Sequence, residues 1–499
     1  GFRERRRVGA LGCPGGRTDW LKVISMSAKT SGTDTVPAHD PAGWRQLPTS
    51  YTPLDHARVA ALMAKEWERY AKTTPGSADH AARSSKTLPL GVTSSFQHWD
   101  PYPIGVKSAR GAYVTDCDDR QVLDLSMGFG AMLAGHLNPT VVAKVKKSLD
   151  DIGTLFVTPS PVSTDVAEKF KERFGLDMLR FTNSGTESTM YAVRVARAYT
   201  GRKEIIKIEG GYHGGYDGLS VSVKPGIDEI GPADNPIPQV PFDAEPGVVH
   251  VVAYNDLGQM ERMLAAKGKN VACVVMEPVI ENLGIVLPDA GYLADVRALC
   301  DAHNVLLIFD EVKTGLTAGA HGAAARLGVK PDLITLAKSI GGGLPLAAFG
   351  GTAEVMQVVV DNRMAHFGTY NGNPLCMAAA AAVDEIATPQ ALAAAEQVND
   401  NAMEAMDAII REYELPAHTV GFGVKGAVTW SPTPIRNYRD YKLSTDFEAA
   451  ELGWLWGINR GVLTPPGMDD QWLVSLAHTD ADMAKWVDAF GELAKELRA

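Results

Sequence analysis

Short apolar segments alternate with stretches of helical periodicity between about residues 135 and 350 of the chain. We interpret five of these segments as buried strands, because each is a brief continuous apolar run. They span residues 178–182, 205–209, 271–277, 305–312 and 333–337. Continuous apolar strands separated by helices are typical of a mostly parallel sheet that is covered on both faces. The pattern therefore predicts an α/β fold.

The two ends of the chain carry a different pattern. Helical spacing marks residues 54–72, and residues 112–125 predict a hairpin whose turn lies near Asp118 and Asp119. From about residue 380, alanine-rich helices precede strand-like segments and a closing helix, which indicates a smaller α+β domain. We expect strands at 424–430 and 472–476. The chain as a whole should divide into four parts: a leader and flexible tail (1–50), an N-terminal segment contributing to the small domain (51–125), a large domain (126–380) and a C-terminal small domain (381–499).

Composition restricts the class of protein. A chain of 499 residues exceeds one compact core, and 45% hydrophobic with 21% charged residues is ordinary for a globular protein. No apolar run approaches about 18 residues, so no membrane span is expected. The net charge of -11 argues against nucleic-acid binding. Five scattered cysteines without a C-x-x-C pair favour reduced thiols in a cytoplasmic protein and no metal site.

The first 25 residues differ from the rest of the chain. Six basic and two acidic side chains give them a local charge of +4, which leaves -15 for the remainder. They lack an apolar core of the kind found in secretory signals. We expect Met26 to be the natural start, and a mass measurement that finds earlier residues in protein from its native source would refute this.

Lys338 ends one of the apolar runs and precedes three glycines, and Asp310 lies near the end of another run. A lysine is costly to bury unless its charge is removed or used. A lysine and an aspartate at neighbouring strand ends can hold pyridoxal phosphate, the lysine as a Schiff base and the acid at the ring nitrogen. Alternatively, Lys338 extends to solvent.

Other strand ends carry suggestive residues, and ligands of open α/β sheets bind beyond those ends. Ser184-Gly185-Thr186 precedes a helix predicted from about Ser188, so these residues either bind phosphate or only cap the helix. Tyr212-His213 lies between glycines, where Tyr212 either stacks on a planar ligand or is incidental. No G-x-G-x-x-G follows the first strand, which disfavours a dinucleotide site.

From about Gly111 to the C-terminus, the chain resembles the class III aminotransferases of the fold-type I pyridoxal-phosphate family. Within that family it is most similar to glutamate-1-semialdehyde aminomutases and β-amino-acid transaminases. The motifs that carry the resemblance are 183–187 (NSGTE), 212–214 (YHG), 310–312 (DEV), 337–343 (AKSIGGG), 368–374 (GTYNGNP) and 474–479 (VSLAHT). The resemblance implies a large domain that binds pyridoxal 5′-phosphate and a smaller α+β domain.

The resemblance also implies a role for each matching residue. Lys338 forms the Schiff base and carries the proton, and Asp310 binds the ring nitrogen. The remaining cofactor contacts are Ser184, Gly185 and Thr186 at the phosphate, Tyr212 with His213 at one ring face, and Val312 at the other. Thr369 reaches the cofactor of a neighbouring subunit, which implies a homodimer, unless it is an ordinary loop threonine. Glu277 either contacts substrate or merely ends a strand.

Substrate recognition departs from the family pattern. Gln97 stands about where the aminomutases place a carboxylate-binding arginine, and Ser94 where the β-amino-acid relatives place theirs. Neither side chain supplies a bidentate charge. We therefore expect Gln97 to contact the substrate, and the alternative is that Arg363 or Arg460 replaces the missing arginine.

Residues 465–472 also differ from the aminomutase gating region. These departures favour a transaminase that moves an amino group from a small amino donor to an oxo acceptor in two half-reactions. The alternatives are an aminomutase, a racemase, decarboxylase or lyase on the same cofactor, and a non-catalytic binding protein.

Overall fold

The computed structural model describes residues 45, 47–240, 247–465 and 471–499, all within one compact unit. The leader expected over residues 1–25, the start at Met26 and most of the 465–472 segment therefore lie outside the described residues. No helix in the described ranges is both long enough and apolar enough to cross a membrane.

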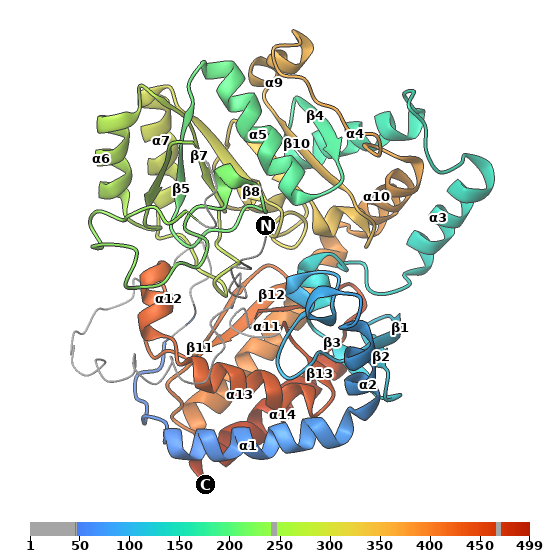
Figure 1. Ribbon diagram of the computed structural model, residues 1–499, viewed down its shortest axis with the longest axis vertical. Coiled ribbons are helices and arrows are strands. Elements are labelled where there is room, and N and C mark those ends of the chain that lie inside the picture. The colour runs from blue at the N-terminus through green and yellow to red at the C-terminus, as the bar shows by residue number, and fades with distance from the viewer. Residues whose placement is uncertain (1–44, 46, 241–246, 466–470) are drawn as a thin grey trace, which may run out of the picture. The chain divides into compact units, whose positions relative to one another are not determined.

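A seven-stranded sheet forms the centre of the upper half of Figure 1. Four of its six strand pairings are parallel, and only those that involve β10 are antiparallel. The strands, in spatial order, are β4 (Met178–Thr182), β10 (Ala347–Gly351), β9 (Leu333–Leu336), β8 (Leu306–Glu311), β7 (Val271–Met276), β5 (Glu204–Ile208) and β6 (Val249–Val252). The sheet is therefore mostly parallel, as predicted.

Helices cover both faces of this sheet because its central strands are apolar on both sides. Cys273 and Val275 of β7 belong to a core with α5, whereas Val274 and Met276 belong to the core that includes α6 and α7. The helices of this part are α3 (Pro139–Asp151), α4 (Pro161–Phe174), α5 (Gly185–Thr200), α6 (Leu257–Lys267), α7 (Tyr292–His303), α8 (Gly322–Arg326), α9 (Ala353–Val360) and α10 (Pro374–Ile386).

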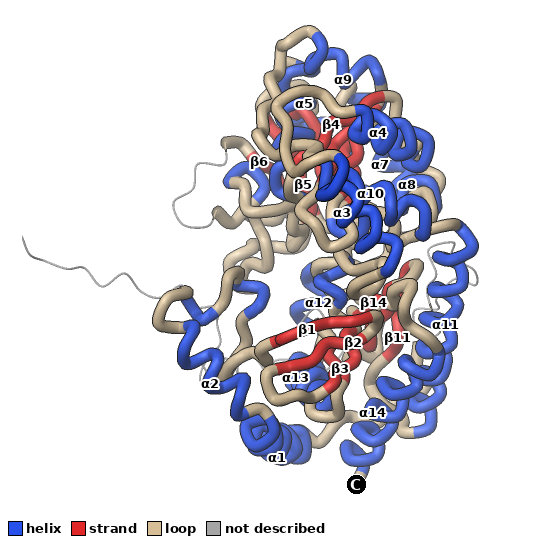
Figure 2. Tube along the Cα trace, turned by 90° about the vertical axis from the view of Figure 1, so that its right-hand side faces the viewer, coloured by secondary structure: helices blue, strands red, loops and turns tan. Residues whose placement is uncertain are grey.

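Two smaller sheets lie together in the lower half of Figure 2. One contains β1 (Val106–Arg110), β2 (Tyr113–Asp116), β3 (Gln121–Asp124) and β13 (Val462–Leu463); the other contains β11 (His418–Phe422), β12 (Lys425–Thr429) and β14 (Trp472–Leu473). The helices beside them are α1 (His56–Thr73), α2 (Pro75–Ser84), α11 (Pro389–Glu412), α12 (Tyr438–Ser444), α13 (Phe447–Ile458) and α14 (Asp480–Arg498).

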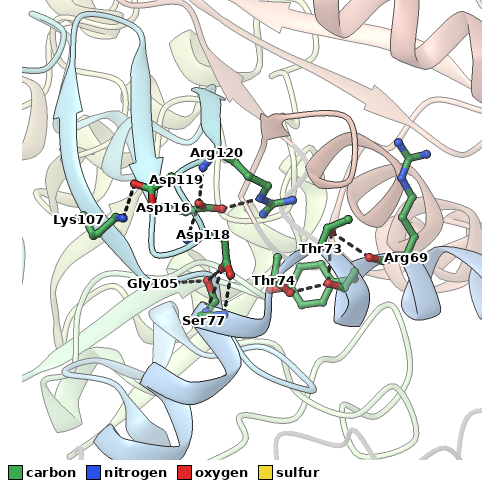
Figure 3. Close-up of polar contacts among 12 residues, drawn as sticks. Arg69, Thr73, Thr74, Ser77, Gly105, Lys107, Asp116, Asp118, Asp119 and Arg120 are labelled. Atoms are coloured by element: carbon green, nitrogen blue, oxygen red, sulfur yellow. Dashed lines mark hydrogen bonds and ion pairs between the residues drawn. The ribbon is translucent and has the colours of Figure 1, made fainter.

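Segments from the two ends of the chain meet in this lower half. The C-terminal strand β13 pairs in parallel with β3, and the blue helix α1 packs on the red helix α13 (Figure 1). The hairpin predicted at 112–125 is confirmed as β2 and β3. In its turn, the carboxylate of Asp118 accepts the N–H groups of Gly76 (2.5 Å) and Ser77 (3.0 Å) at the start of α2. Figure 3 shows Asp118 beside Ser77.

The five strands predicted between residues 178 and 337 are present within one residue of their expected limits, and the helices expected at 54–72 and at the C-terminus are α1 and α14. The strand expected at 424–430 is β12, whereas the one expected at 472–476 is present only as the two-residue β14. The predictions missed β6 and β10, and β10 is rich in alanine and glycine, which have low strand propensity. Helix α5 begins at Gly185 rather than near Ser188, because the Ser184 hydroxyl accepts the N–H of Glu187 and caps the first turn. The predicted domain limits stay a prediction.

Candidate active site

A cavity of about 320 Å³ opens at the carboxyl ends of β7, β8 and β9 and at the start of α5. Parallel strands end at one edge of the sheet, so the residues that follow them converge there. Nine of the eleven predicted site residues line this cavity: Ser184, Gly185, Thr186, Tyr212, His213, Glu277, Asp310, Val312 and Lys338.

The other two predicted residues lie elsewhere in this chain. Gln97 is exposed, and its side-chain oxygen accepts the N–H (3.2 Å) and hydroxyl (2.7 Å) of Thr93. Thr369 is exposed on the loop between α9 and α10. Neither residue lines the cavity of its own chain.

The carboxylate of Asp310 is held at the end of β8 by three donors. Its Oδ1 accepts the N–H of Val312 and the hydroxyl of Thr335, both at 3.0 Å, and its Oδ2 lies 2.8 Å from Nδ1 of His213. An ionised carboxylate has about four acceptor positions, so one position is left for a further donor. A protonated ring nitrogen is such a donor. The other ring nitrogen of His213, Nε2, is buried and has no partner in the described part of the chain.

Lys338 lies two residues after the end of β9 and has a φ of 50°, in the left-handed region that residues with a side chain rarely adopt. Among the described residues, its ammonium makes no hydrogen bond or ion pair. The pKa of Lys338 is lowered to about 8, mainly by burial and then by the nearby charge of Lys425, against the opposing effect of Asp310, Glu277 and Glu281. A backbone held in a disfavoured region and an unpaired amine are typical of a reactive lysine.

The start of α5 forms part of the cavity wall and has the features of an anion site. Ser184 caps the N–H of Glu187, but the N–H groups of Gly185 and Thr186 have no acceptor among the described residues. They are accompanied by the positive end of the helix dipole, which suits a phosphate. A Cβ at Gly185 would lie 2.9 Å from a methyl of Val312, so only glycine fits between the helix and β8.

Aromatic rings form another part of the wall. Tyr212 makes an edge-to-face contact with Phe96 at 5.7 Å between ring centroids, and Phe96 packs in turn on Phe129 at 5.7 Å. The sequence predicted Tyr212 but neither phenylalanine. Burial raises the pKa of Tyr212, and the charge of Asp310 adds to that effect.

Glu277 follows β7 and is buried in the cavity wall. Its carboxylate accepts the side-chain amide of Asn282 at 2.8 Å and the N–H of Glu281 at 3.0 Å. Burial raises its pKa, which the charge of His213 partly offsets. Glu277 therefore follows a strand and also lines the cavity. Its position at a strand end is compatible with contact to the substrate, the other alternative left open by the sequence.

Two polar contacts were missed by the sequence analysis. Thr335 is fully buried within β9 and orients Asp310, and Asn282 orients Glu277. The signal for Thr335 was a hydroxyl inside an otherwise apolar strand, because a buried polar group needs a partner.

The arginines suggested as substrate clamps lie outside the cavity. Arg363 donates to the carbonyl of Ala198, and Arg460 pairs with Glu66 and Glu492. The residues that line the cavity in the described ranges include no arginine.

The residues present fit pyridoxal phosphate: an unpaired lysine, a carboxylate with one free acceptor position, an aromatic ring and a helix start with free N–H groups. The described residues contain no group of three histidine, cysteine or acidic side chains that could hold a metal ion.

The chain belongs to the class III aminotransferase family, whose model matches residues 95–445. Enzymes of this family depend on pyridoxal 5′-phosphate, so the match confirms the resemblance, the fold class and the cofactor expected from the sequence.

Individual proteins agree with this assignment. The chain is 36% identical over 420 residues to the glutamate-1-semialdehyde 2,1-aminomutase of Methanocella arvoryzae, covering 82% of this chain and 97% of that protein. Among solved structures, an omega-transaminase from Sphaerobacter thermophilus is 31% identical (TM-score 0.79; 85% and 98% covered). A glutamate-1-semialdehyde aminomutase from Pseudomonas aeruginosa in complex with PMP is 28% identical (TM-score 0.82; 89% and 100% covered).

Proposed function

We propose that this enzyme transfers an amino group between two separate molecules, an amino donor and an oxo acceptor. The observation that carries the proposal is the unpaired Lys338 amine, with its lowered pKa, in one cavity with the anchored carboxylate of Asp310. When bound, pyridoxal phosphate supplies the aldehyde and a ring that withdraws electrons from the substrate carbon.

The chain's own residues supply the proton transfer and the positioning. In its neutral form, the Nζ of Lys338 would take a proton from the donor carbon and deliver it to the bound cofactor, and in the second half-reaction it would move a proton in the opposite direction, to the acceptor carbon. Asp310 holds a protonated ring nitrogen, while His213 and Thr335 keep the carboxylate in place. The N–H groups of Gly185 and Thr186 bind the phosphate, and Tyr212 limits the movement of the ring.

A second candidate is an intramolecular aminomutase, which is favoured by the names of the most similar relatives. Two observations favour transfer between molecules instead. By resemblance, Gln97 stands about where the aminomutases place an arginine, and its side chain is bound to Thr93 outside the cavity. The described cavity wall also offers aromatic rings rather than an arginine fork.

The test separates the two half-reactions. An amino donor alone should change the visible absorbance of the holoenzyme, and a keto acid, aldehyde or ketone should then restore it. A panel of donors and acceptors, with glutamate-1-semialdehyde as a single substrate, decides between the candidates. If no acceptor restores the absorbance while glutamate-1-semialdehyde is isomerised, the enzyme is an aminomutase.

We further propose that the enzyme works as a homodimer in which Thr369 of each subunit contacts the cofactor of the other. Exposed apolar side chains beside Thr369 support this proposal, since Phe367 is 81% and Tyr370 62% exposed. Mixing Lys338→Ala subunits with Thr369→Ala subunits should restore activity, because one site of each mixed dimer is then intact. No recovery after confirmed subunit exchange would contradict a shared site.

A further inference from the structure

A buried ion pair lies directly behind the cavity wall. The Nζ of Lys425 on β12 is 2.5 Å from Oε2 of Glu281, and the two side chains are 2% and 0% exposed. Removing two charges from water costs several kcal/mol per ion in general, which makes such a pair a weak source of stability. None of the roles described above uses it.

The pair is connected to the cavity on several sides. Lys425 also donates to the carbonyl of Lys313 at 3.0 Å, and Lys313 donates to the carbonyl of Glu281 at 2.5 Å. Lys313 lines the cavity, as does Asn282, the neighbour of Glu281.

On the side away from Glu281, the ammonium of Lys425 lies against the backbone of Gly130. A Cβ built at Gly130 would lie 3.4 Å from the Nζ of Lys425, and Gly130 follows the cavity residue Phe129 with a φ of 102°. A single layer of residues therefore separates this ammonium from the site.

We infer that Lys425, held in place by Glu281, is a positioning residue that acts through Lys338 by favouring the neutral form of its amine. The charged groups around Lys338 are Asp310 near the end of β8, Lys313 just after β8, Glu277 and Glu281 after β7, and Lys425 on β12. The three carboxylates favour the ammonium, whereas Lys425 opposes it. After burial, Lys425 has the largest effect on the pKa of Lys338, and Glu281 has the smallest effect of the three carboxylates. The pair therefore acts on Lys338 as a net positive charge.

The consequence for the reaction is direct. Lys338 must be neutral to take a proton, and a fixed cation inside a poorly solvated region keeps it neutral closer to physiological pH. This role rests on the proposed function of Lys338, but the protonation of its amine can be measured without any amino transfer.

The test uses the full-length enzyme without cofactor. Lysines are labelled by reductive methylation at a series of pH values, and labelling of the Lys338 peptide is quantified by mass spectrometry relative to exposed Lys65. Lys425→Met should move the midpoint of Lys338 labelling upward by about one pH unit, which lowers labelling near pH 7 about tenfold. Glu281→Gln should move the midpoint downward, and Lys425→Arg should leave it near the wild-type value.

A purely structural role would not move the midpoint in opposite directions for the two partners. The inference is overturned if Lys425→Met and Glu281→Gln leave the midpoint unchanged, or if both move it the same way, in protein with wild-type circular dichroism. If Lys425→Met does not fold, Glu281→Gln and the double variant Lys425→Met/Glu281→Gln decide, and the double variant should still lie above wild type. If no oxo acceptor restored the absorbance, the proposed function would be refuted, but the expected midpoints of Lys338 labelling would not change.

Discussion

Removal of the Thr335 hydroxyl should weaken cofactor binding through Asp310. Thr335 is fully buried, and its hydroxyl is one of two donors to Oδ1 of Asp310. Thr335→Val keeps the shape of the side chain and removes only this donor. The Asp310 carboxylate then keeps the N–H of Val312 and the contact with His213, but it loses one of the contacts that fix its orientation.

The size of the effect follows from the charge of the acceptor. A hydrogen bond to a charged group contributes about 1.5–3 kcal/mol. Because two other donors remain on Asp310, we expect the lower part of that range to be lost from cofactor binding, about 1.5 kcal/mol. Each 1.4 kcal/mol is about a factor of ten in affinity. The dissociation constant should therefore rise about tenfold.

Pyridoxamine phosphate is the suitable ligand for this measurement, because it binds without a bond to Lys338. Its dissociation constant is measured by calorimetry or fluorescence for wild type, Thr335→Val and the matched control Thr335→Ser, which keeps the hydroxyl. Asp310→Ala gives the full loss of the carboxylate. The reasoning is refuted if Thr335→Val binds within about twofold of wild type while Asp310→Ala binds far more weakly.

Three further predictions concern lysines and one glycine. Amino transfer should fall as the pH drops below about 8, because the pKa of Lys338 is lowered to about 8 and its neutral form is lost below that value; a pH profile of the half-reaction with an amino donor tests this. Lys207 donates to the carbonyls of Gly211 and Val221, and burial lowers its pKa to about 7. Between that value and the pKa of about 10.4 in the unfolded chain, the unfolded state binds more protons. Wild type should therefore gain stability over Lys207→Met as the pH rises from 7 to 9, by up to about 1.4 kcal/mol per unit, and parallel melting curves would contradict this. Gly185→Ala should destabilise the protein by about 1–3 kcal/mol through overlap with Val312, and Val312→Ala in the same chain should restore part of that loss in thermal melts.

The positions that carry chemistry at strand ends were predictable because the sheet is parallel. Asp310, Lys338 and Glu277 each follow a short apolar run, and such runs end at one edge of a parallel sheet. The order of these runs along the chain was therefore enough to predict that the three residues lie close together. The same reasoning could not predict β10. Its segment is rich in alanine and glycine and carries no strand pattern, and its antiparallel pairing with β4 and β9 depends on contacts between distant segments.

Contacts between distant segments were beyond the sequence patterns. Gln97 was assigned to the site from its place in a motif, yet a local turn binds its side chain to Thr93 and leaves it exposed. Lys425 and Glu281 are 144 positions apart and form a pair only because β12 packs against the loop after β7. No periodicity connects such residues, since the pairing belongs to the packing of one sheet on the other.

The charges around the cavity indicate how the phosphate of the cofactor is bound. Lys313, Lys338 and the nearby Lys425 are balanced by Glu277, Glu281 and Asp310, so full ionisation gives no net charge. Burial raises the pKa of Glu277 and thereby favours a slightly positive site. That surplus is small against a phosphate dianion, and the described wall has no arginine fork. We therefore expect the free N–H groups at the start of α5 to provide much of the phosphate binding, and a side chain at Gly185 to harm both packing and affinity.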